Sequence, residues 1–142
     1  MSLRYTLSLS ILCTFTWTSA ATAQSQPPSE PPAGWGVTAI DFSNVPYPYP
    51  VEYLDVEVYG RNLQMAFMDV APAGTPNGQT VVLFHGFNFA GYAFAGTMEI
   101  LRNAGFRTIA IDRLGFGRSS KPIMHYNFHI PARNTKRLLD HL

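Results

Sequence analysis

The sequence brings together a serine, a histidine and an aspartate, the residue types of a nucleophilic triad. They are Asp112, Ser119 and His125. A triad needs its serine on an exposed, strained turn and within hydrogen-bond reach of the histidine. Nothing around Ser119 predicts such a turn. We therefore expect these three residues to do no joint catalysis.

Histidine spacing suggests a second chemistry, metal binding. His125 and His129 would share one face of a helix at i, i+4, and His141 follows further on. Imidazole nitrogen is a common metal ligand. However, Pro131 fits the first turn of a helix, so that the stretch before it is a lead-in. We expect exposed loop histidines, no metal site and no other cofactor.

A third candidate is a short glycine motif that follows a continuous apolar run. The run is Thr80-Val-Val-Leu-Phe84, and His85-Gly86-Phe87-Asn88 comes directly after it. Such a run is typical of a strand buried on both faces. Glycine after the strand lets the backbone approach another group closely.

A second glycine loop follows about 25 residues later, directly after the apolar run 107–111. It reads Asp112-Arg-Leu-Gly115-Phe-Gly117-Arg-Ser119-Ser-Lys-Pro122. Gly115 and Gly117 permit a tight turn. Asp112 can accept amide hydrogen bonds within the loop and Ser119 can cap it locally. The motif indicates an architectural loop.

Together the two motifs resemble the early half of the α/β-hydrolase fold, in the branch with an HG-x oxyanion loop and a D-x-x-G-x-G-x-S loop. The similarity covers about residues 51–142. The resemblance implies a reaction in which negative charge develops on an oxygen, and one backbone amide aimed at that oxygen is worth about 3–4 kcal/mol. It implies that the Phe87 amide is one such donor, with His85 and Gly86 shaping the loop. Asn88 stands where the epoxide-hydrolase and dehalogenase branches usually have proline.

The resemblance also implies groups that these 142 residues do not contain. The family carries a nucleophile elbow, G-x-S-x-G or a variant, followed by an acid and a histidine. The segment 117–121 begins like an elbow but ends in lysine and follows the wrong strand. We therefore predict half an oxyanion hole, no nucleophile and no activity for this chain.

The function that follows is the amino-terminal part of a secreted hydrolase that cleaves an ester-like or related bond in a small apolar substrate. One alternative is a non-catalytic exported binding or interaction protein derived from the same fold. Another is an unrelated small α/β binding domain in which the HG motif arises by chance.

The elements that would hold these motifs follow from periodicity. Apolar residues alternate over 54–58, which predicts a half-buried strand, and 63–70 predicts a second one. Gly60-Arg61-Asn62 is the expected turn between them, so that the pair forms a hairpin. A helix over about 92–104 then joins the apolar runs 80–84 and 107–111, which makes a parallel βαβ unit.

A further helix is expected after Pro131, with Leu138, Leu139 and Leu142 on one stripe. The predicted class is therefore α/β, a partial α/β-hydrolase fold with an incomplete sheet. Strand 81–84 would then have an open apolar edge, and such edges favour aggregation or self-association.

The first 23 residues have the order of a secretory signal peptide. A short start with Arg4 precedes an apolar stretch, and Ala21-Thr22-Ala23 is a small-x-small cleavage pattern. Interspersed Ser and Thr disfavour a membrane anchor. A proline-rich lead over 24–50 separates this peptide from the domain at 51–142. We expect a secreted or periplasmic protein that meets no membrane after cleavage.

Composition excludes several other classes. Ten Lys and Arg against nine Asp and Glu leave a net charge of +1, so that charge provides no argument for nucleic-acid binding. The one cysteine, Cys13, excludes a disulfide framework and a cysteine-based zinc site. The expected partner of the complete protein is a small-molecule substrate.

Overall fold

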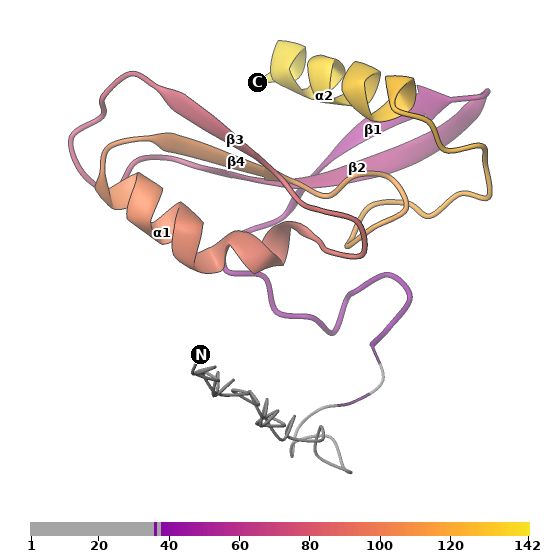
Figure 1. Ribbon diagram of the computed structural model, residues 1–142, viewed down its shortest axis with the longest axis horizontal. Coiled ribbons are helices and arrows are strands. Elements are labelled where there is room, and N and C mark those ends of the chain that lie inside the picture. The colour runs from indigo at the N-terminus through magenta and orange to yellow at the C-terminus, as the bar shows by residue number, and fades with distance from the viewer. Residues whose placement is uncertain (1–35, 37) are drawn as a thin grey trace, which may run out of the picture. The chain divides into compact units, whose positions relative to one another are not determined.

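The structure, a computed structural model, describes residue 36 and residues 38–142. The predicted signal peptide and the first part of the proline-rich lead lie outside these residues. Figure 1 shows one mixed sheet with a helix on each face. Its order is β1-β2-β4-β3. The strands are β1 (Glu52–Val58), β2 (Arg61–Val70), β3 (Thr80–Phe84) and β4 (Arg107–Ile111).

The pairing confirms the predicted hairpin and the predicted parallel unit. β1 and β2 pair antiparallel, and β3 and β4 pair parallel with α1 between them in the chain. β2 and β4 pair antiparallel and join the two parts into one sheet. The chain therefore has the predicted α/β class, with a hairpin and a parallel unit in one open sheet.

The hairpin turn lies one residue earlier than the sequence suggests. Val58 pairs with Arg61, so that Tyr59 and Gly60 alone form the turn. Both have positive φ, 51° and 70°, which is the pattern of a type I′ turn and matches the twist of the strands. Tyrosine rarely adopts positive φ, and this is why the expected turn at 60–62 was wrong.

Alternation along the strands divides the core between the two faces of the sheet. Met65, Phe67, Ile109 and Ile111 point toward one face, where they pack with Leu138 of α2. Met68 and Ala110 point toward the other face and pack with Met98 of α1. The two helices thus cover opposite faces of the sheet, α1 next to β4 and α2 next to β1 (Figure 1).

α1 (Ala95–Asn103) follows a 3₁₀ turn, η1 (Gly91–Phe94), so a 3₁₀ turn and a shorter α-helix together occupy 91–103, where one helix was predicted over about 92–104. Gly105 has a φ of 90°, and a Cβ there would lie 2.5 Å from the Thr75 carbonyl oxygen. Only glycine fits at this position, which ends the helix as expected.

α2 (His129–His141) contains Pro131 in its first turn, as predicted, and His129 as its first residue rather than as a loop histidine. Leu138 is fully buried, whereas Leu139 and Leu142 remain 46% and 38% exposed. Two of the three leucines of the predicted stripe therefore remain exposed. No helix among the described residues has the length and apolar character needed to cross a membrane.

One expectation about burial was wrong. β4 is buried on both faces, but in β3 the three central residues are only half-buried and Phe84 is 51% exposed. The cause is position, because β3 lies at the end of the sheet and β4 is its one partner among the described strands. A continuous apolar run predicts burial only where a strand has neighbours on both sides.

Candidate functional site

The loop after β3 contains a tight turn that exposes the Phe87 backbone. The amide of Phe89 donates a hydrogen bond to the Gly86 carbonyl at 3.3 Å, which closes a four-residue turn. Asn88, the third residue, has a φ of 63°. A positive φ at this position alone marks a type II turn, which accepts glycine or asparagine there. Proline has φ near −65°, so the HG-x-P form would not fit this backbone.

The amide of Phe87 has no hydrogen-bond acceptor within the part of the chain that the structure describes. Phe87 is 76% exposed, so the residue lies at the surface. An unpaired backbone donor held by a turn is what stabilisation of an oxyanion requires. The sequence-predicted donor therefore lies in a conformation that suits this role.

His85 holds the near end of this turn. Its ring is buried, its Nδ1 lies 2.8 Å from the Gly86 carbonyl oxygen, and its Nε2 accepts a hydrogen bond from the Arg113 amide at 3.1 Å. Nε2 must therefore carry a lone pair, and Nδ1 carries the proton. Burial lowers the pKa of His85, so the neutral ring is favoured.

Asp112 holds the chain just after this turn. Its carboxylate is 1% exposed and accepts hydrogen bonds from the Gly91 amide at 2.5 Å and the Arg118 amide at 2.8 Å. It also accepts one from the Tyr47 hydroxyl at 2.6 Å. A Cβ on Gly117 would come within 2.1 Å of the carboxylate, so glycine is needed there. Asp112 thus fixes both its own loop and the residue that follows the Phe87 turn.

Among the described residues, the Ser119 hydroxyl forms hydrogen bonds with backbone groups alone. Ser119 is 2% exposed, and its hydroxyl accepts a hydrogen bond from the Ala66 amide and donates one to the Asp112 carbonyl. Its contact with Asp112 is therefore to the backbone, and no hydrogen bond joins it to His125. Gly115 turns the chain beside Tyr126. No three potential metal ligands cluster within residues 36 and 38–142.

An open hollow of about 490 Å³ lies beside the turn. Its aromatic lining consists of Phe87, Phe116, Tyr126 and Phe128. The rings of Phe87 and Phe116 meet edge to face at 5.4 Å. Tyr126 and Phe128 were not expected here, because nothing in the sequence indicates that the segment before α2 returns to the HG loop. The hollow can accept an apolar group beside the Phe87 turn.

Known proteins of one fold family are similar to this chain. A family model described as alpha/beta hydrolase fold matches residues 79–142. A haloalkane dehalogenase from Mycolicibacterium paratuberculosis is 39% identical over 77 residues, 54% of this chain and 25% of the relative. A putative non-heme chloroperoxidase from Synechocystis is 40% identical over 65 residues, 46% of this chain and 24% of the relative.

Solved structures agree. A probable hydrolytic enzyme from Pseudomonas aeruginosa superposes with a TM-score of 0.71 at 42% identity, over 74% of this chain and 34% of that one. A haloalkane dehalogenase from Paraglaciecola agarilytica superposes with a TM-score of 0.60 at 32% identity, over 71% of this chain and 34% of that one.

The chain therefore has a partial α/β-hydrolase fold, which the matching family model and the solved structures both support. It spans about a quarter of the length of the curated relatives given above, and is thus a partial portion of such a domain. The relatives bear the names of several hydrolase and peroxidase activities, so the match defines the class of protein without selecting one reaction.

Proposed function

We propose that the complete protein is a secreted hydrolase that cleaves an ester-like or related bond in a small apolar substrate, and that the Phe87 amide donates a hydrogen bond to the oxyanion. The observation that carries the proposal is the unpaired Phe87 N–H group, held by a clamped turn beside an aromatic hollow. The nucleophile, acid and histidine would lie outside these 142 residues.

A substitution that removes only the donor tests this role. Proline is favoured at the second position of a type II turn, so Phe87→Pro deletes the N–H group with little cost to the turn. Phe87→Ala is the matched control, because it removes the ring and keeps the amide. Both belong in a polypeptide that extends the same reading frame to a nucleophile, assayed with a short-chain nitrophenyl ester.

We expect Phe87→Pro to lower kcat by about 10²–10³-fold, as loss of one oxyanion donor does. Phe87→Ala should act mainly on KM, since it removes apolar contact from the hollow. Equal kcat values for the two variants would exclude the proposed donor. The 142-residue chain alone should hydrolyse the ester no faster than buffer, because it lacks the G-x-S-x-G elbow.

Export is part of the same proposal. The small-x-small pattern at 21–23 predicts that a chain secreted by a bacterial host begins at Gln24, which intact mass spectrometry would show. An extended reading frame without any nucleophile would instead favour the non-catalytic binding protein.

A further inference from the structure

Residues 41–49, called the strap below, pack along the loop that follows β4. Arg118 provides most of the contacts: its Nη2 donates to the Val45 carbonyl at 2.9 Å and its Nε to the Phe42 carbonyl at 3.4 Å. Its guanidinium also lies over the ring of Tyr47, 4.5 Å from the centroid. One cation thus holds three positions of the strap.

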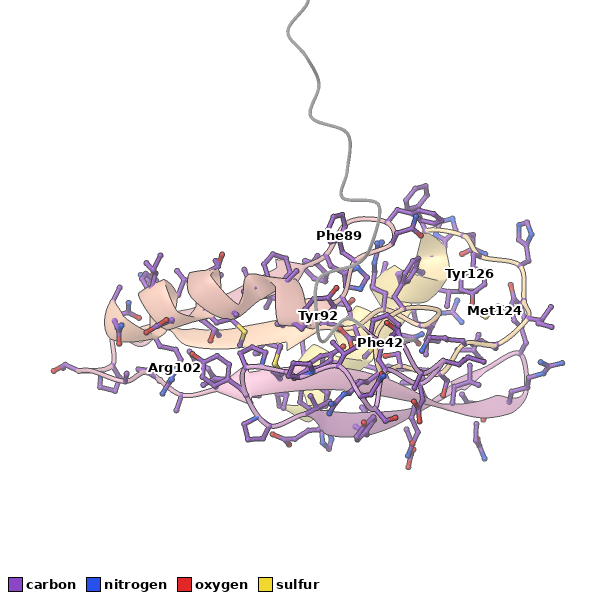
Figure 2. All side chains as sticks on the ribbon, turned by 90° about the horizontal axis from the view of Figure 1, so that it is seen from below. Phe42, Phe89, Tyr92, Arg102, Met124 and Tyr126 are labelled. Atoms are coloured by element: carbon purple, nitrogen blue, oxygen red, sulfur yellow. The ribbon has the colours of Figure 1, made fainter. Side chains whose placement is uncertain are left out.

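Aromatic contacts hold the other side of the strap. Tyr92 of η1 lies 5.8 Å from the Tyr47 ring and 6.5 Å from the Phe42 ring. Figure 2 shows Phe42 and Tyr92 close together beside the start of the helical segment. The strap is therefore held between η1 and the glycine loop. The first of these follows the Phe87 turn in the chain, and the second contacts the Phe87 ring through Phe116.

Tyr47 connects the strap to a buried charge. Its hydroxyl donates to Asp112 Oδ2, the same oxygen that accepts from the Arg118 amide. Burial and the neighbouring carboxylate raise the pKa of Tyr47 above its ordinary value, so the phenol remains a donor. Hydrogen bonds to a charged acceptor are among the stronger ones in proteins.

Asp112 connects the Tyr47 hydroxyl to the segment that contains the Phe87 turn. Its other oxygen, Oδ1, accepts from the Gly91 amide just after the turn. The next residue, Arg113, donates its amide to His85 just before the turn. Two consecutive residues therefore hold the turn at both ends, and the Tyr47 hydroxyl holds the first of them.

We propose that Tyr47 is a positioning residue: by donating to Asp112 from the strap, it sets the conformation of the turn that presents the Phe87 amide. This inference rests on the proposed role of that amide. The rest of the strap serves to hold the phenol in place, with Arg118 as its main support.

Tyr47→Phe and Tyr49→Phe form a matched pair for the test. Tyr49 belongs to the same Tyr-Pro-Tyr-Pro segment, and its ring contacts Arg102 at 5.0 Å. Its hydroxyl forms no hydrogen bond with any described residue. Each variant removes one phenolic oxygen, but only Tyr47→Phe removes a donor to Asp112.

The measurement is hydrogen–deuterium exchange of the 142-residue chain at low micromolar concentration, read by mass spectrometry of its peptides. Exchange rates are compared between Tyr47→Phe and Tyr49→Phe, with segment 105–111 as the internal reference. We expect segments 86–94 and 112–120 to exchange about tenfold faster in Tyr47→Phe, because this variant loses a hydrogen bond to a charged group. No turnover is required, so this result is independent of the ester assay.

Three outcomes would overturn the inference. Faster exchange confined to segment 38–50 would mean that the phenol anchors the strap alone. An equal increase in every segment would mean a global loss of stability, and unprotected exchange throughout the wild-type chain would mean that these contacts do not form.

A second measurement covers the case in which Tyr47→Phe fails to fold. In the wild-type protein labelled at tyrosine Cζ, the Tyr47 resonance should stay phenolic well above pH 10, the ordinary region for tyrosine ionisation. Ionisation of Tyr47 near pH 10 would exclude the hydrogen bond to Asp112 and, with it, the positioning role.

Discussion

The backbone amide of Arg113 donates a hydrogen bond to Nε2 of His85 at 3.1 Å. This contact links the end of β4 to the loop after β3, and it decides which ring nitrogen of the histidine is protonated. A histidine whose Nε2 accepts from a backbone amide cannot act as a proton acceptor in catalysis without losing that contact. His85 is therefore a structural element of the Phe87 turn.

Acid should weaken the domain through His85. Protonation of Nε2 would place two N–H groups against each other, and burial already lowers the pKa of His85 in the folded state. The unfolded chain therefore takes up this proton more readily than the folded one. The contribution to stability is complete above about pH 6.5, the unfolded value, and is lost as pH falls through the folded-state pKa.

Denaturant titrations between pH 8 and pH 5 would measure this loss. His85→Asn should flatten the pH dependence and lower stability at pH 8, where the wild-type ring is neutral. His125→Gln is the control, because His125 is exposed and the hydrogen bonds of the turn remain intact. A His85→Asn variant that retains the full acid sensitivity would contradict the explanation.

Gly117 should tolerate no side chain. Its φ is 51°, and a Cβ would lie 2.1 Å from Asp112 Oδ2 and 2.8 Å from the Ala90 Cβ. Left-handed backbone strain and displacement of a buried carboxylate together predict that Gly117→Ala destabilises by at least about 2 kcal/mol. The free energy of unfolding from urea titration measures it.

Gly96→Ala is the matched control for Gly117→Ala. Gly96 lies in α1, and a Cβ there would meet nothing within 4 Å. Alanine is favoured over glycine in a helix by about 0.5–1 kcal/mol, so this variant should be slightly more stable than wild type. Similar losses in the two variants would mean that the loop around Asp112 adapts easily.

Much of the sheet follows from apolar patterning, whereas the site depends on contacts between distant residues. β3 and β4 fall on the expected runs, because an apolar run between turn residues has few alternatives to a strand. The extent of β3 burial was not predictable, since burial depends on the neighbouring strand. The Tyr47 to Asp112 hydrogen bond joins residues 65 positions apart, and no local pattern encodes such a pairing.

Two neighbouring serines provide a test of the role of Ser119. Ser119 and Ser120 each accept a hydrogen bond from a β2 amide, that of Ala66 and that of Gln64 respectively. Ser119 is buried, so Ser119→Ala leaves the Ala66 amide and the Asp112 carbonyl without a hydroxyl partner and should cost about 1–3 kcal/mol. Ser120→Ala affects an exposed amide and should stay within about 0.5 kcal/mol.

The Ser119→Ala and Ser120→Ala variants also distinguish a structural role of Ser119 from a catalytic one. Thermal unfolding would show the difference in stability, and an ester assay would show whether either serine takes part in a reaction. We expect neither variant to change the rate with the 142-residue chain, because the Ser119 hydroxyl is buried and, in the described part of the chain, hydrogen-bonded to backbone groups alone. Ester turnover that Ser119→Ala abolishes would establish Ser119 as a nucleophile and overturn its structural assignment.

The open edge of β3 should make this chain self-associate. β4 is the one strand paired with β3 in the described region, so the outer N–H and C=O groups of Thr80–Phe84 have no strand neighbour. Edge strands that are apolar and uncharged pair with other chains. Sedimentation velocity should therefore show association that increases with concentration.

A charge at the edge of β3, Val81→Lys, should reduce this association. Ile123→Lys is the control and should not reduce it, because Ile123 is 96% exposed and lies outside the sheet. Equal effects of the two lysines would point to general solubility, and a monomer at all concentrations would show that the edge is protected.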